Sequence, residues 1–131
     1  MYVEERMYLL HPGKVPEYFK VYEAEGMPTQ LKHLPHMVGY YVTEVGMQNM
    51  VTHMWAYDDL NQREKCRAAM QADPAWQAYV GKVRPLIVTQ DTRIMKTAPF
   101  FTARLQKMRP AKPRYRATRH AWPARWPRWS I

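Results

Sequence analysis

The sequence has one cysteine, five glycines and no long apolar run, and each scarcity excludes a class of protein. A lone thiol, Cys66, cannot form a disulfide within the chain, so a disulfide-stapled secreted domain is excluded and a reducing, cytoplasmic setting is expected. No segment approaches the ~18 apolar residues of a membrane span, and the acidic residues 1–10 do not resemble a signal peptide. A P-loop, a nucleophile elbow and a Gly-rich dinucleotide motif are also absent.

Acidic residues are absent from residues 102–131, although the chain has eleven of them. Residues 1–101 balance these acids with eleven Lys and Arg, so the remaining nine cations all lie beyond residue 101. We interpret residues 1–101 as one globular domain and residues 102–131 as a disordered tail rich in Pro, Arg and Trp. The tail could contact an anionic membrane or nucleic acid non-specifically, or it could be an appendage without a selected function.

Hydrophobic periodicity predicts an α+β fold. Residues 2–10 alternate as a strand, residues 14–34 have a helical period with a kink or end at 26–28, and residues 36–58 read as a β-hairpin. Asp59 and Asp73 are typical N-caps, each opening a helix, and residues 86–95 form a fourth strand. This strand-helix-strand-strand-helix-strand order predicts a ferredoxin-like βαββαβ antiparallel sheet with helices on one face.

The hairpin has two apolar faces. A four-residue connection at 46–49 would pair Val42 with His53. One face then shows Val38, Tyr40, Val42, Glu44, Val51, His53, Trp55 and Tyr57. The other face has the small residues Gly39 and Ala56, so we assign it to the helices. The first face would then be an exposed apolar patch, which predicts a homodimer through the open sheet face.

Several short motifs follow one another in an order that resembles the NIPSNAP family, within the dimeric α/β-barrel superfamily. They are VEERMY at 3–8, PGK at 12–14, VGYYVTEVG at 38–46, HMWAY at 53–57, Arg67, DPAW at 73–76 and PF at 99–100. The resemblance implies a ferredoxin-like protomer that pairs through its open sheet face as a dimeric α/β barrel. Longer animal members are associated with mitochondria and vesicle trafficking. Superfamily relatives include cofactor-less monooxygenases, isomerases and haem-degrading enzymes, so the resemblance selects no reaction.

The face predicted to be open is also the candidate ligand site. With the first strand alongside, it would form an aromatic cavity between paired sheets, lined by Glu4, Arg6, Tyr8, Tyr40, Glu44, His53, Trp55 and Tyr57. As catalytic roles, His53 could act as an acid or base, Arg6 could hold a carboxylate or enolate, and Tyr40 could donate to an oxyanion. Alternatively, the pairs Glu4–Arg6 and Glu44–His53 only satisfy buried polar groups in a dimer interface.

No metal or cofactor is predicted. The pair His33 and His36 has no further ligand at a suitable spacing, and Cys66 is best interpreted as a structural thiol. Three functions stay open. The protein could bind a small apolar or aromatic acid and even act as a cofactor-independent monooxygenase or isomerase. It could be a non-enzymatic assembly or trafficking module, or it could act through its basic tail.

Overall fold

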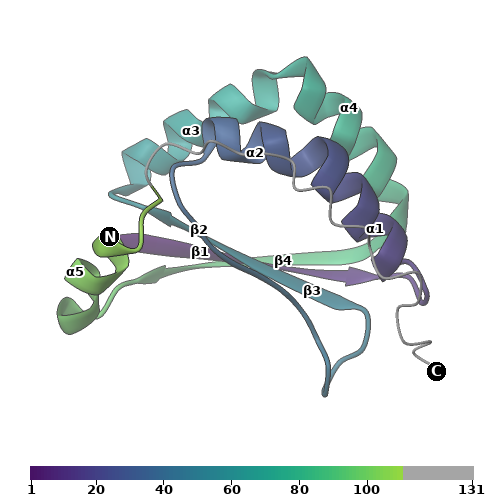
Figure 1. The fold of residues 1–131 in the computed structure, drawn as a ribbon, viewed down its shortest axis with the longest axis horizontal. Helices are drawn as coiled ribbons and strands as arrows, with labels where there is room; N and C mark the ends of the chain where they lie inside the picture. Colours follow the sequence, from purple (N-terminus) through teal and green to yellow (C-terminus); the bar gives the residue numbers. More distant parts are fainter. Residues whose placement is uncertain (111–131) are drawn as a thin grey trace.

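A computed structural model describes residues 1–110 of the chain, which form one four-stranded antiparallel sheet and a helical layer (Figure 1). The elements are β1 (Tyr2–Leu10), α1 (Val15–Val21), the π-helical segment η1 (Tyr22–Gly26), α2 (Met27–His33), β2 (Met37–Val42), β3 (Met50–Tyr57), α3 (Leu60–Ala72), α4 (Pro74–Val83), the 3-10 turn η2 (Arg84–Leu86), β4 (Ile87–Lys96) and α5 (Pro99–Lys107). The strand order is β2-β3-β1-β4, and α1 to α4 cover one face of the sheet. The predicted α+β, ferredoxin-like architecture is confirmed.

The two predicted N-caps are confirmed. The Asp59 carboxylate accepts a hydrogen bond of 2.7 Å from the backbone N–H of Gln62, and Asp73 accepts one of 2.9 Å from Ala75. Asp73 also lies 2.8 Å from the His33 ring and so connects the end of α2 to the start of α4. These contacts fix where α3 and α4 begin over the sheet.

The first helical run continues through residues 26–28, where a kink or end was predicted. The π-helical segment η1 joins α1 to α2, and Pro28 lies in the first turn of α2, where a missing N–H is tolerated. A Cβ atom on Gly26 would lie 2.7 Å from the Tyr79 ring and 2.8 Å from the Tyr22 ring. Glycine at this position therefore lets η1 approach α4 closely instead of breaking the helix.

The hairpin register differs from the prediction by two residues. β2 ends at Val42, residues 43–49 form the connection, and His53 pairs with Tyr40 rather than with Val42. Gly46 and Asn49 have positive φ angles of 129° and 61°, which shape this longer loop. Because side chains alternate with a period of two, the shift leaves Tyr40 and His53 on the same face.

The assignment of the two hairpin faces was wrong. Trp55 and Tyr57 are fully buried, and they pack in a core cluster with Leu34 and Met70, beneath the helices. The opposite face, with Gly39, Tyr41 and Met54, is the open one. The space between the sheet and the helices is filled by large aromatic side chains such as Trp55 and Tyr57. Small side chains alone would leave voids in this layer, which a close-packed protein interior does not tolerate.

Helix α5 lies at the end of the sheet where β1 begins and β4 ends (Figure 1). Leu105 of α5 is fully buried, and the side chains of Arg109 and Asp58 form an ion pair. The predicted boundary between residues 101 and 102 therefore falls inside α5, and order extends further than expected. The rest of the predicted tail, residues 111–131, lies outside the described residues. Within residues 1–110, no helix is both long enough and apolar enough to span a bilayer.

Candidate functional site

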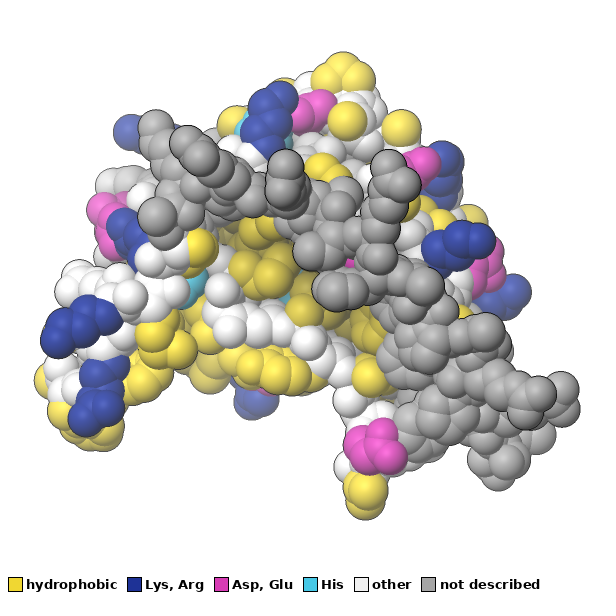
Figure 2. Space-filling view, viewed as in Figure 1, with side chains coloured by type: hydrophobic (Ala, Val, Ile, Leu, Met, Phe, Trp, Pro, Cys, Tyr) yellow, Lys and Arg dark blue, Asp and Glu magenta, His cyan; other side chains and the backbone are white. Residues whose placement is uncertain are grey.

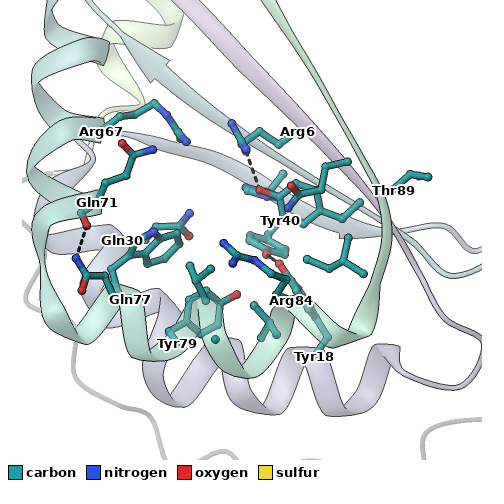
Figure 3. A pocket seen from close by; sticks show the side chains of 18 of the residues that line it. Arg6, Tyr18, Gln30, Tyr40, Arg67, Gln71, Gln77, Tyr79, Arg84 and Thr89 are labelled. Atoms are coloured by element: carbon teal, nitrogen blue, oxygen red, sulfur yellow. Dashed lines mark hydrogen bonds between the residues drawn. The ribbon is translucent and has the colours of Figure 1, made fainter.

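A cavity of about 900 Å³ lies between the sheet and the helices of a single chain, not between paired sheets as predicted (Figure 3). Strand residues form its floor and helical residues its walls. Its lining includes the predicted residues Arg6, Tyr8, Tyr40 and His53, together with Tyr18, Gln30, Arg67, Gln71, Trp76, Gln77, Tyr79, Arg84, Thr89 and Gln90.

The other four predicted site residues do not line the cavity. Glu4, Trp55 and Tyr57 are fully buried behind it. Glu44 is exposed in the connection between β2 and β3, because β2 ends two residues before it. The hypothesised Glu44–His53 pair is therefore wrong, whereas the Glu4–Arg6 pair is present at 2.6 Å.

Three arginines surround the single buried carboxylate of Glu4. Arg6 and Arg63 donate to its two oxygens at 2.6 Å and 2.5 Å, and Arg67 lies 3.5 Å away. Burial pushes the pKa of Glu4 upward, but the hydrogen bonds from Arg63 and Arg6 outweigh it and hold the pKa below its ordinary value. The carboxylate has one negative charge and the three guanidinium groups have three positive charges, so the cluster has a net charge of +2. Arg6 and Arg67 line the cavity, so this positive charge faces it.

His53 is held in one neutral tautomer. The indole N–H of Trp55 donates to Nδ1 of His53 at 2.8 Å, so the ring proton lies on Nε2. Burial, with the charge of Arg6 beside it, lowers the pKa of His53 to about 3. Nε2 has no hydrogen-bond partner among residues 1–110. This state makes His53 a hydrogen-bond donor, whereas the hypothesised acid/base role would need a ring that titrates near neutral pH.

Tyr40 connects His53 to a cluster of buried tyrosines. Its ring stacks on His53 with centroids 4.6 Å apart, and its hydroxyl lies 2.8 Å from that of Tyr18. Burial raises the pKa of Tyr40 well above its ordinary value and the pKa of Tyr18 to about 12. Both phenols are therefore protonated at neutral pH, which fits the donor role hypothesised for Tyr40.

Sequence reasoning missed the residues that the helices contribute to the cavity. Neither Tyr79 nor Gln30 belongs to any of the sequence motifs named above. Arg67 is different, since it belongs to the motifs that carry the family resemblance. Its place among those motifs, without an assigned structural role, was the signal available in the sequence.

The remaining candidates have structural contacts. His33 pairs with Asp73, His36 is buried near Arg109, and burial raises the pKa of the Cys66 thiol. Within residues 1–110, no three His, Cys, Asp or Glu side chains gather where they could hold a metal ion.

Comparisons with known proteins agree on one family. The NIPSNAP family model matches residues 3–102. Protein NipSnap homolog 2 of Danio rerio is 36% identical over 92 residues, covering 70% of this chain and 32% of that protein. Human NipSnap homolog 3A is 33% identical over 102 residues, covering 76% of this chain and 40% of that protein. The chain thus spans roughly a third of the length of these curated relatives.

Solved structures show the same relationship. A NIPSNAP family protein with unknown function from Agrobacterium tumefaciens is 42% identical with a TM-score of 0.74, covering 76% of this chain and 90% of that one. A NIPSNAP domain protein from Burkholderia xenovorans is 35% identical with a TM-score of 0.73, covering 76% and 97%. A putative antibiotic biosynthesis monooxygenase from Nitrosomonas europaea shares the fold alone, at 11% identity and a TM-score of 0.58. The family match over residues 3–102, with these relatives, shows that the chain belongs to the NIPSNAP family.

Proposed function

We propose that the chain binds a small organic anion with an apolar or aromatic body in the cavity between the sheet and the helices. The observation that carries the proposal is the excess of two positive charges around Glu4, because Arg6 and Arg67 face the cavity (Figure 3). Guanidinium groups bind carboxylates with paired, charge-assisted hydrogen bonds. Tyr8 and Tyr40 on the floor, with Tyr18 and Tyr79 on the walls, supply apolar and aromatic surface for the rest of the ligand.

The neutral His53 supports binding more directly than it supports a reaction. The neutral ring has one N–H, on Nε2, and it lacks a partner within residues 1–110. It can therefore donate to a ligand oxygen without any change in its protonation state. A monooxygenase or isomerase that abstracts a proton would need a base, and His53 already carries its proton on the nitrogen that is not paired with Trp55.

The charge of the ligand can be tested with 3-phenylpropionate and its uncharged amide as probes. We expect the protein to bind the acid and not the amide in isothermal titration calorimetry. Arg67→Gln should weaken binding of the acid about tenfold or more, since a hydrogen bond to a charged group contributes about 1.5–3 kcal/mol.

Arg63→Gln is the matched control, because Arg63 contacts the same carboxylate but does not line the cavity. It should weaken binding less than threefold. Equal affinity for the acid and the amide, or equal losses in the two variants, would contradict an anion site at Arg67.

We also propose that a second copy of the chain covers the open sheet face. Tyr41 and Met95 on this face are 56% and 37% exposed, beside Met7 and Met54. Hydrophobic side chains also lie along the side of the molecule opposite the helices (Figure 2). Phe100 in α5 is 85% exposed, and Val45 in the loop between β2 and β3 is 92% exposed. Exposed apolar surface of this extent is typical of an isologous interface.

Light scattering after size-exclusion chromatography should give twice the 15.6 kDa mass of one chain at micromolar concentration. Tyr41→Glu should shift the mass to one chain, because it places a charge in the proposed interface. Leu60→Glu is the control, since Leu60 is 45% exposed but lies at the start of α3. A monomeric wild type would exclude this dimer.

A further inference from the structure

Gln30 is a buried polar residue of the cavity that none of the roles above uses. It lies on α2, is only 3% exposed and faces the cavity together with Arg67 and Gln71 of α3 (Figure 3). Its amide oxygen accepts a hydrogen bond of 2.7 Å from the hydroxyl of Tyr22. Its amide nitrogen makes no hydrogen bond within residues 1–110, so both amide hydrogens remain available to the cavity.

The π-helical segment supplies the hydrogen-bond partner of this amide. Tyr22 opens η1 and is 5% exposed. Its ring lies 4.5 Å from that of Tyr40 and 6.0 Å from that of Tyr79, and Gly26 allows α4 to close against it. In this packing the Tyr22 hydroxyl donates to the amide oxygen of Gln30, which places the oxygen on the protein side and the nitrogen on the cavity side. Segments of π-helix are frequent at functional sites because they displace a side chain in this way.

Besides the tyrosine hydroxyls, three kinds of hydrogen-bond donor face the cavity. Arg6 and Arg67 are cationic donors, His53 is a neutral ring donor, and Gln30 is a neutral amide donor. The two oxygens of a carboxylate can accept from the arginines and from His53, which leaves the Gln30 amide needing a second acceptor on the ligand. A buried donor without an acceptor costs about 1–3 kcal/mol, so a ligand that lacks the second acceptor is disfavoured.

We infer that Gln30 is a specificity-determining residue, and that it selects organic acids with a second acceptor oxygen such as a keto group. This inference rests on the proposed anion site. It adds that the site distinguishes acids of equal charge and similar shape by a single oxygen atom.

Two probe acids isolate that atom. Phenylpyruvate and 3-phenylpropionate have the same carbon chain, ring and carboxylate, and they differ by the keto group. The wild-type protein should bind phenylpyruvate about tenfold or more tightly in calorimetry, because a buried hydrogen bond of about 1–3 kcal/mol is gained. Gln30→Met, which keeps the length of the side chain and removes the amide, should abolish this preference while changing the affinity for 3-phenylpropionate less than threefold.

A second variant tests the orientation of the amide. Tyr22→Phe keeps the ring and its packing but removes the hydroxyl that holds the amide oxygen, so the preference should fall to about threefold. If Gln30→Met does not fold, Tyr22→Phe serves as the test of the inference in its place. A tenfold preference retained in Gln30→Met, or in Tyr22→Phe if it replaces that variant, would overturn the role of Gln30 and leave the anion site intact. Binding of neither acid by the wild type would overturn the anion site itself.

Discussion

Replacing Glu4 with glutamine is expected to lower the free energy of unfolding by about 2–4 kcal/mol, since removing one partner of a buried ion pair costs about 3–5 kcal/mol when the other stays buried. Glu4 is fully buried, whereas the side chains of Arg6, Arg63 and Arg67 are 16%, 20% and 17% exposed, which reduces the cost. Glutamine keeps the shape but leaves three guanidinium groups without a negative charge among them. Urea unfolding followed by circular dichroism would measure the loss.

Glu5 provides a matched control on the same strand. Its carboxylate pairs at 2.7 Å with Arg93, whose side chain is 62% exposed, on the open face of the sheet. The Glu5 side chain is itself only 10% exposed, but it has one arginine partner instead of three, and that guanidinium stays hydrated without it. Glu5→Gln should therefore cost less than Glu4→Gln, about 1–2 kcal/mol. Equal losses of stability in Glu4→Gln and Glu5→Gln would contradict the prediction that the charge of Glu4 stabilises the three arginines around it.

Acidification from pH 6.5 to 4.5 is expected to lower the free energy of unfolding by about 2–3 kcal/mol through His53, at about 1.4 kcal/mol per pH unit. In the unfolded chain the ring takes up a proton below about pH 6.5. In the folded protein the pKa is lowered to about 3, so the ring stays neutral in this range. The unfolded state therefore binds more protons, and stability falls with pH. The lowered pKa of Glu4 removes stability mainly below about pH 4.5 and adds only a few tenths of a kcal/mol to the loss within this window.

His53→Gln separates this contribution from the others. Unfolding curves at pH 6.5 and 4.5 should differ much less for this variant than for the wild type. Some dependence should remain, because burial also lowers the pKa of His36. His11→Gln, at an exposed position, should behave like the wild type. A wild type whose stability is constant over this range would contradict a neutral, buried His53.

The fold could be predicted from the sequence because its signals are local. Alternation in residues 2–10 and the caps at Asp59 and Asp73 act within a few residues, and the structure confirms them. The grouping of Tyr40 with His53 on one face also followed from alternation. Which face meets the helices did not, because both are similarly apolar and the deciding contacts, such as those of Trp55 with Leu34 and Met70, join distant segments.

The site could be predicted only in part for the same reason. Arg6, Tyr8, Tyr40 and His53 lie on strands whose neighbours follow from alternation. Gln30 and Arg67 come from helices whose distance from the sheet depends on the close approach at Gly26 and on the aromatic layer beneath them. The tautomer of His53 depends on one contact with Trp55, two residues away, whose geometry a sequence does not specify. The inferred cytoplasmic setting stays a prediction.

Residues of one chain line the cavity, with its floor and its walls drawn from the same fold. Stoichiometry follows from this arrangement. Each chain should take up one ligand whatever its oligomeric state, and titration of a dimer should give two equivalent sites with a Hill coefficient near one. A mixed dimer with one inactivated cavity should keep half of its capacity at unchanged affinity.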